Sequence, residues 1–210
     1  MHYLVTGGTG FLGQFLIERL LARKGSTVHV LVRKASQKKF AALAKKRGWD
    51  PRRVLAVEGD IAQPGCGLAP ATLRALAAKK IAHVFHLAAV YDLTASAEEQ
   101  RAANVDGTRH ALDLAVALKA GCFHHTSSIA AAGLYPGVFR EDMFEEAEGL
   151  DDPYLRTKHE AEGLVRAETR IKWRIYRPGM VVGHSQTGEM DKIDGPYYFF
   201  TLIKKLRQML

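Results

Sequence analysis

Tyr154 and Lys158 stand four residues apart in the stretch DDPYLRTKHEAE, a spacing that could support proton transfer. Either Asp151 or Asp152 can cap a helix whose first turn contains Pro153, so the tyrosine and the lysine would share one helical face. An ammonium beside a phenol stabilises the phenolate and lowers its pKa, which makes the hydroxyl usable as an acid or base near neutral pH. Such a pair is also common by chance on helices, so the motifs elsewhere in the chain decide whether it has a catalytic role.

Two serines, Ser127 and Ser128, follow HHT at the end of a predicted strand. In an open α/β sheet, the carboxyl ends of the strands are where ligands bind. One of these hydroxyls could therefore donate a hydrogen bond to a substrate oxygen beside Tyr154. The sequence predicts one serine and one tyrosine acting on the same oxygen.

The stretch LVTGGTGFLGQFL (residues 4–16) repeats glycine at intervals of three between an apolar run and an amphipathic one. At a strand-to-helix turn the backbone amides lack intrahelical partners, and the helix dipole favours an anion. There Gly7 would permit the tight turn, Gly10 would let the main chain approach a pyrophosphate, and Gly13 would let the helix pack closely on the sheet. A simple glycine-rich turn is the alternative, but the flanking strand and helix favour dinucleotide binding.

The residue expected to meet the adenosine ribose is basic. Arg33, with Lys34 beside it, stands twenty positions beyond Gly13, where an NAD-binding chain usually carries an acid. A guanidinium suits a 2′-phosphate, which favours NADPH, although Arg33 could simply lie on the surface. Asp60, in EGDI, is placed to contact the adenine side or to cap a turn.

Strand-like and helix-like segments alternate along the chain. Near-continuous apolar strands separated by helices indicate a parallel sheet covered on both faces, which is an α/β, doubly wound Rossmann fold. The expected strands are residues 2–6, 27–32, 53–59, 81–89, 122–128 and 173–179. The expected helices are residues 11–24, 36–47, 70–79, 97–119 and 153–170.

The 210 residues, 47% hydrophobic and 25% charged, predict one soluble domain spanning residues 1–210. No apolar run is long enough to span a bilayer and no signal segment is present, so we expect a cytoplasmic protein with no integral membrane segment. Much of the net charge of +8 lies in residues 33–53, which is typical of a solvated helix face over Phe40, so no nucleic-acid partner is expected. Two cysteines, Cys66 and Cys122, do not make a disulfide framework.

Other features carry no predicted chemistry. His83 and His86 would face opposite sides of a strand, as would His124 and His125, so no metal site is expected. The acidic stretch at 141–148 is interpreted as a solvated loop. The tail at 197–210 has an apolar stripe of Phe199, Phe200, Leu202, Ile203, Leu206 and Leu210. That stripe suits a helix packed on something else, with a membrane-surface helix as the alternative.

In order and spacing, these motifs resemble those of an extended short-chain dehydrogenase/reductase. The motifs are TGGTGFLG, HLAA (86–89), NVDGT (104–108), TSS (126–128), YLRTK (154–158) and RPGMVVG (177–183). Within that family the chain looks most like the reductase domain of bacterial alcohol-forming fatty acyl-CoA reductases. The stretches HVFHLAAVYDLTA, FREDMFEEAEGLDDPYLRTKHEAE and YRPGMVVGHSQTGEMDKIDGPYYFF carry that likeness.

The resemblance implies a role for each matching residue. Tyr154 would donate the proton and Lys158 would hold the nicotinamide ribose. Ser128, or less favourably Ser127, would polarise the carbonyl, and Asn104 would support the lysine or a water. The implied cofactor-binding residues are Gly7, Thr9, Gly10, Phe11, Leu12, Gly13, Arg33, Asp60, Ile61, Leu87, Ala88, Ala89, Tyr154, Lys158, Pro178 and Gly179.

The implied reaction is hydride transfer from NADPH to a fatty acyl thioester such as acyl-CoA, giving an aldehyde and, in some relatives, the alcohol. Extended reductases continue into a helical substrate cap that these 210 residues do not include, and the lack of a carrier domain favours a free CoA thioester. A related dehydrogenase acting on a nucleotide sugar or sterol-like alcohol, and a non-catalytic NADP-binding module, are the alternatives. The sequence does not decide whether the chain forms a homo-oligomer.

Overall fold

The computed structural model describes residues 1–90, 95–190 and 197–207. The chain divides into two compact units, residues 1–178 and residues 179–210, and each is described by itself. The first unit contains the sheet and the residues with predicted chemistry, apart from Gly179.

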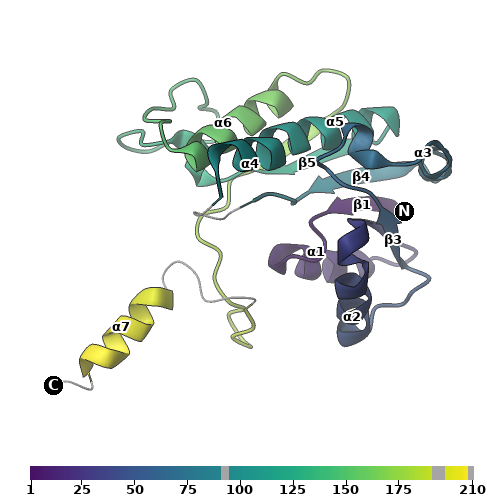
Figure 1. Cartoon of the computed structure of the whole chain (residues 1–210), viewed down its shortest axis with the longest axis horizontal. Coiled ribbons are helices and arrows are strands. Elements are labelled where there is room, and N and C mark those ends of the chain that lie inside the picture. Colours follow the sequence, from purple (N-terminus) through teal and green to yellow (C-terminus); the bar gives the residue numbers. More distant parts are fainter. Residues whose placement is uncertain (91–94, 191–196, 208–210) are drawn as a thin grey trace. The chain divides into compact units, whose positions relative to one another are not determined.

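Six parallel strands form one sheet in the first unit, in the order β3-β2-β1-β4-β5-β6 (Figure 1). This order reverses direction between β1 and β4, which creates a crevice at the carboxyl ends of those two strands. The strands are β1 His2–Thr6, β2 Thr27–Val32, β3 Val54–Glu58, β4 Ile81–His86, β5 Cys122–Thr126 and β6 Trp173–Tyr176. The predicted doubly wound α/β fold is confirmed.

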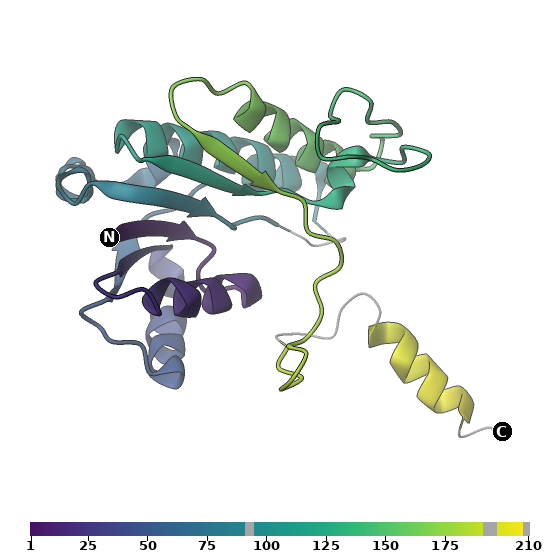
Figure 2. The same ribbon diagram turned by 180° about the vertical axis from the view of Figure 1, so that it is seen from behind.

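Helices cover both faces of the sheet, as Figures 1 and 2 show from opposite sides. On one face, α1 (Phe11–Leu21) and α2 (Gln37–Arg47) bury a core that includes Tyr3, Ile17 and Phe40. On the other face, α3 (Pro70–Ala78), α5 (Gly107–Ala117) and α6 (Pro153–Arg166) close over a second core. Most lysines and arginines of α2 stay exposed while Phe40 is buried, as the sequence predicts for a solvated basic face.

The segment expected as a single helix over 97–119 is divided in three. It begins as α4 (Ala97–Arg101), whose Ser96 and Glu99 form a reciprocal capping box. A π-helical turn follows at Ala102–Asp106, and α5 continues from Gly107. The wider π-turn contains the buried Asn104, and such turns are frequent at functional sites.

The acidic loop at 141–148 is better anchored than predicted. Met143 is buried, and the Phe144 ring stacks on His159 of α6 at a centroid separation of 4.2 Å. The guanidinium of Arg166 lies over the same ring. The carboxylates around these two side chains remain exposed, so the loop is solvated on one side only.

The second unit contains α7 (Tyr197–Arg207), whose first residue accepts a hydrogen bond from the Gly183 amide at 2.7 Å. Phe199, Phe200, Ile203 and Leu206 are exposed on it, as expected for an apolar stripe. Leu210, the last residue of the predicted stripe, lies outside the described residues. Within the described part of the chain, every helix is too short or too polar to cross a membrane.

Candidate active site

The glycine loop between β1 and α1 is shaped by backbone contacts. Gly7 has φ +71°, and a Cβ there would lie 2.6 Å from the Ala88 amide nitrogen at the end of β4. A Cβ on Gly13 would overlap the Gly7 carbonyl oxygen. The tight turn predicted for Gly7 is confirmed. The atoms nearest to a Cβ on Gly13 belong to the main chain of Gly7 and Gly8, so this glycine lets the helix start lie close to the loop that follows β1.

Among the residues that the structure describes, no side chain caps the amino end of α1 through a hydrogen bond. Gly10 is the N-cap, it provides no capping side chain, and the first turn holds no acidic residue. By contrast, Ser96 and Asp152 cap α4 and α6 through their side-chain oxygens. Uncapped amides at a helix N-terminus attract an anion, so α1 fits a phosphate group better than those two helices do.

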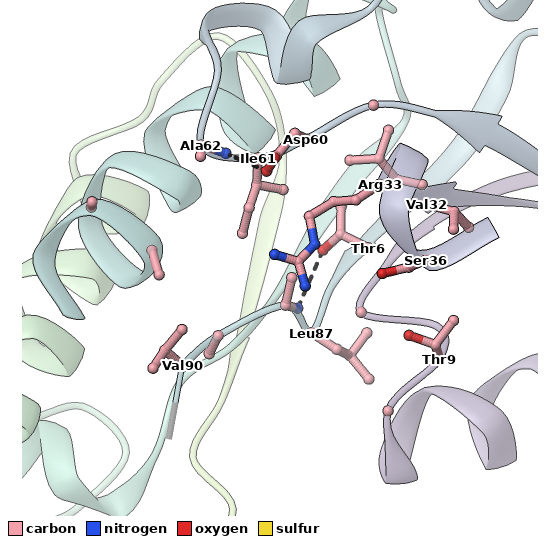
Figure 3. A pocket seen from close by; sticks show the side chains of 18 of the residues that line it. Thr6, Thr9, Val32, Arg33, Ser36, Asp60, Ile61, Ala62, Leu87 and Val90 are labelled. Carbon is pink, nitrogen blue, oxygen red and sulfur yellow. Dashed lines mark hydrogen bonds between the residues drawn. The ribbon is translucent and has the colours of Figure 1, made fainter. Parts of the chain in front are cut away.

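A pocket of about 510 Å³ lies at the crevice between β1 and β4, and we call it the switch-point pocket (Figure 3). Nine of the predicted cofactor residues line it: Gly7, Thr9, Gly10, Arg33, Asp60, Ile61, Leu87, Ala88 and Ala89. The Arg33 side chain projects into the pocket from the end of β2. Asp60 lines the wall and also accepts a hydrogen bond from the Ala62 amide at 3.0 Å, so it both faces the pocket and caps a turn.

Several lining residues were missed by sequence reasoning. They are Thr6, Leu31, Val32, Ser36, Gly59, Ala62, Val90, Glu99, Ala102 and Ala103. Ser36, three residues beyond Arg33, could have been found from the same loop. Glu99 of α4 is far from the glycine loop in the sequence, and only the fold brings it to the pocket.

The other predicted cofactor residues lie outside this pocket. The Phe11 ring packs edge-on against Phe15, at 5.2 Å between centroids. Leu12 and Pro178 line a second hollow described below. Gly179 is the first residue of the second unit.

Helix α6 presents Tyr154, Lys158 and Glu162 at successive intervals of four residues. Asp152 is the N-cap and accepts hydrogen bonds from the amides of Tyr154 at 2.8 Å and Leu155 at 3.1 Å. This fixes the helix start that the sequence predicted at Asp151 or Asp152.

Lys158 is buried, and its Nζ donates to the Thr126 carbonyl oxygen at 3.0 Å. Burial lowers the pKa of this ammonium to about 8, and the Glu162 carboxylate opposes that shift. A partly destabilised ammonium at this position remains mostly charged at neutral pH, because its pKa lies above 7.

Glu162 is completely buried and collects four hydrogen bonds. Its carboxylate accepts from Ser127 Oγ at 2.7 Å, from Arg177 at 2.6 and 3.0 Å, and from Arg166 at 2.8 Å. Burial alone would raise the pKa of this carboxyl, but the donors overcome that effect and hold the pKa below its usual value. The carboxylate therefore ties the ends of β5 and β6 to α6.

The two serines are placed differently. Because Ser127 donates to Glu162, its hydroxyl hydrogen is committed to the buried cluster. Ser128 Oγ accepts from the Ala130 amide at 3.1 Å, which leaves its hydroxyl hydrogen available for another oxygen. Ser128 also caps a short turn that α6 holds through a 2.9 Å contact between His159 Nδ1 and the Ala131 carbonyl oxygen.

The hydrogen bonds of the Asn104 side chain go to Val90 and Thr157, and none of those found in the described residues joins it to Lys158. Support of a water, the other predicted role, stays a prediction. The Asn104 side chain accepts from the Val90 amide at 2.8 Å and donates to the Val90 carbonyl at 3.2 Å and to Thr157 Oγ1 at 3.3 Å. The amide therefore joins the segment after β4 to the helix that carries Tyr154 and Lys158.

A chain of hydrogen bonds connects Asn104 to the glycine loop. Thr108 Oγ1 donates to the Asn104 carbonyl at 2.6 Å and contacts His86 Nε2 at 3.1 Å. His86 Nδ1 contacts Thr6 Oγ1 at 2.8 Å, and Thr6 Oγ1 accepts from the Ala88 amide at 3.3 Å. Because Thr108 Oγ1 already gives its hydrogen to Asn104, it accepts from His86 Nε2, and His86 Nδ1 accepts from Thr6 Oγ1. The neutral imidazole therefore carries its hydrogen on Nε2. Burial supports neutrality, because it lowers the pKa of His86 to about 3.

A second hollow, of about 1220 Å³, adjoins the ends of β5 and β6, and we call it the apolar groove. Leu87 lines both this groove and the switch-point pocket. The groove's apolar side chains come from Leu12, Leu16, Phe85, Leu87, Ile129, Ala132, Tyr135, Phe139, Trp173, Ile175, Tyr176 and Pro178. An apolar substrate portion could therefore lie next to the cofactor crevice.

Three side chains that the sequence did not associate meet on neighbouring strands. His83 Nδ1 of β4 lies 2.9 Å from His124 Nε2 of β5, and Cys122 stands two residues before His124 on the same face. The histidine pairs considered from the sequence do face apart, as expected. The cross-strand pairing depends on the register of His83 with Cys122, which sequence periodicity does not contain.

Comparisons with known proteins agree with this geometry. Over 206 residues the chain is 34% identical to a linear gramicidin synthase of Brevibacillus parabrevis, covering 91% of this chain and 4% of that protein. It is 30% identical over 216 residues to aldehyde reductase lnaA of Aspergillus flavus, covering 90% and 20% respectively.

A solved structure with the same architecture is the terminal R domain from the myxalamid PKS-NRPS biosynthetic pathway. It is 34% identical with a TM-score of 0.77, and the match covers 89% of this chain and 51% of that one. The chain thus spans about half of that solved domain and a fifth or less of the two curated relatives. A family profile described as Male sterility protein matches residues 5–209. The chain therefore belongs to this NAD-binding family of extended short-chain dehydrogenases/reductases.

Proposed function

We propose that the chain is the cofactor-binding and catalytic part of an NADPH-dependent reductase that acts on an acyl thioester. The observation that carries the proposal is the combination of an uncapped, glycine-lined helix start with an α6 face that presents Tyr154 beside a buried Lys158. The oxidoreductase family and its NAD(P)-binding fold support it.

The residues of the switch-point pocket suit a dinucleotide. The first turn of α1 offers main-chain amides without a competing side chain, and the absence of a Cβ on Gly7 keeps the loop close to Ala88. Arg33 would bind the 2′-phosphate that distinguishes NADPH from NADH, and Asp60 lies on the same wall. NADPH supplies a hydride when bound.

Residues of this chain would stabilise the negative charge on the substrate oxygen and protonate it. Ser128 and Tyr154 would donate hydrogen bonds to the thioester carbonyl, where negative charge develops as a hydride reaches the carbon. Tyr154 would then give its proton to that oxygen, and the Lys158 ammonium would stabilise the resulting phenolate. The resulting hemithioacetal breaks its C–S bond, its hydroxyl proton passes to sulfur, and an aldehyde and a thiol leave.

The apolar groove favours an acyl chain as the substrate portion beside the carbonyl. A fatty acyl-CoA is the specific substrate we propose, with a long-chain aldehyde as product. Because Leu87 lines both cavities, a chain lying in the groove would end next to the cofactor crevice.

The test is a mixture of purified chain, NADPH and a long-chain acyl-CoA, followed by nicotinamide absorbance and by free thiol release. We expect thiol and oxidised cofactor to appear in equal amounts, and Tyr154→Phe to stop both while still binding NADPH. Turnover retained in Tyr154→Phe would refute the assigned proton donor. Cofactor binding without turnover on thioesters, nucleotide sugars or sterol-like alcohols would instead identify a non-catalytic module.

A further inference from the structure

We propose that His83, Cys122 and His124 form a binding site for a zinc ion on the sheet face beside the apolar groove. The three side chains offer two imidazole nitrogens and one sulfur, and the three ligand atoms all lie within 4.8 Å of one another. Nitrogen and sulfur donors in this combination are the ligands that Zn²⁺ prefers. The inference is independent of the proposed reductase function.

Strand register brings the ligands together. His83 of β4 is the direct partner of Cys122 of β5, and parallel partners point to the same face of a sheet. His124, two residues after Cys122, returns to that face and stacks on Phe85 at 4.2 Å between centroids. Two adjacent strands therefore supply the whole set, so little backbone rearrangement is required.

The histidine nitrogens are already oriented for a shared cation. His83 Nδ1 and His124 Nε2 lie 2.9 Å apart, so one of these nitrogens donates its hydrogen to the lone pair of the other. Both nitrogens therefore point towards the same position. Tetrahedral Zn²⁺ at about 2.0–2.1 Å from each nitrogen would need these atoms about 3.3 Å apart. Small side-chain rotations of the half-buried His83 and Cys122 would provide that opening and bring the sulfur closer to the buried His124.

A hydrogen bond behind His124 resembles the support that metal-binding histidines usually have. His124 Nδ1 contacts the Tyr176 hydroxyl at 2.8 Å, which fixes the ring orientation and leaves Nε2 turned to the cluster. Burial lowers the pKa of His124 to about 4, so the ring is neutral and able to bind a metal at pH 7. Burial raises the pKa of the Cys122 thiol, and the nearby Arg174 and Lys172 lessen that rise.

The bound ion would join β4 to β5 at a place where the sheet borders the apolar groove, since Phe85 and Tyr176 line the groove and flank His124. Its expected effect is a stronger connection between these two interior strands. The fourth coordination position would be taken by water, because three protein ligands leave one position open.

The test uses Zn²⁺ alone in calorimetry and Co²⁺ as a spectroscopic substitute, both on the whole chain. We expect one equivalent to bind, a thiolate-to-cobalt charge-transfer band to appear, and zinc to raise the unfolding temperature. Cys122→Ser should remove the band, and Tyr176→Phe should weaken zinc binding by about tenfold, as for other supporting hydrogen bonds.

His2→Gln provides the matched control. His2 Nδ1 and His29 Nε2 form the other close imidazole pair in the described residues, 3.2 Å apart. This variant should keep both the band and the affinity. Absence of the band from the native chain, or a band that persists in Cys122→Ser, would overturn the site. Circular dichroism of each variant confirms folding, and His83→Gln, at a half-buried position, tests the site again should Cys122→Ser unfold.

Discussion

Replacing Glu162 of α6 with glutamine removes a buried negative charge. That charge pairs with Arg166 on the same helix and with Arg177 after β6, and it accepts a hydrogen bond from Ser127 after β5. The side chain is fully buried, and Arg177 beside it is 13% exposed, so the arginine would keep its charge without its main partner. Removing one member of a buried, hydrogen-bonded ion pair costs about 3–5 kcal/mol. Because glutamine keeps the shape and one acceptor oxygen, we expect Glu162→Gln to lose about 3 kcal/mol of unfolding free energy.

The same change should alter the chemistry through Lys158. Glu162 raises the pKa of that ammonium against the effect of burial, so the native value of about 8 should fall in Glu162→Gln. The charged ammonium is present below its pKa and lost above it, so activity should decline above about pH 8 in the native chain. In the variant that decline should begin at lower pH.

Urea unfolding and pH–rate profiles measure the two effects separately. Glu160→Gln is the matched control, because Glu160 lies on the same helix and pairs with Arg101 at the surface. Surface ion pairs contribute about 0–1 kcal/mol, so this control should stay near the native stability and keep the native pH profile. A Glu162→Gln variant as stable as Glu160→Gln, or with an unmoved pH profile, would refute the reasoning.

Two further predictions concern the glycine loop and the buried histidine chain. Gly7→Ala and Gly25→Ala both place a side chain at positive φ, which costs about 1–2 kcal/mol of stability. Only the Gly7→Ala side chain would also collide with Ala88, so only this variant should lose NADPH binding in calorimetry. Equal effects of the two variants on NADPH binding would exclude the collision. His86 has a pKa of about 3 when folded and 6.5 otherwise, so its contribution is complete above pH 6.5 and is lost as pH falls towards 3. As the pH falls from 6.5 towards 3, urea unfolding should show that His86→Gln loses less unfolding free energy than the native chain, by about 1.4 kcal/mol per pH unit. The same slope of unfolding free energy against pH in both proteins would contradict this.

Local patterns were enough to predict the fold and much of the switch-point pocket. The glycine loop, Arg33 and the strand ends at Asp60 and Leu87 depend on spacing within single segments, and these residues do line one pocket. The start of α6 at Asp152 was equally readable, because capping depends on the next three residues.

The remaining features depend on which segments become neighbours. Glu162 binds Ser127, 35 residues away, and nothing in either segment specifies the pairing. The contact between His83 and His124 likewise requires a particular strand register. The π-turn at Asn104 interrupts a pattern that looks continuously helical, and the support it gives to Val90 arises only in the folded chain.

Calorimetric titration of NADPH and NADH into the native chain and Arg33→Ala tests the cofactor assignment most directly. The native chain should bind one NADPH and prefer it to NADH. In Arg33→Ala, loss of a charge-assisted phosphate contact should weaken NADPH binding by roughly 10- to 100-fold and leave NADH binding unchanged. No binding of either coenzyme to the folded native chain would contradict the assignment, and equal weakening of both would remove Arg33 from the phosphate.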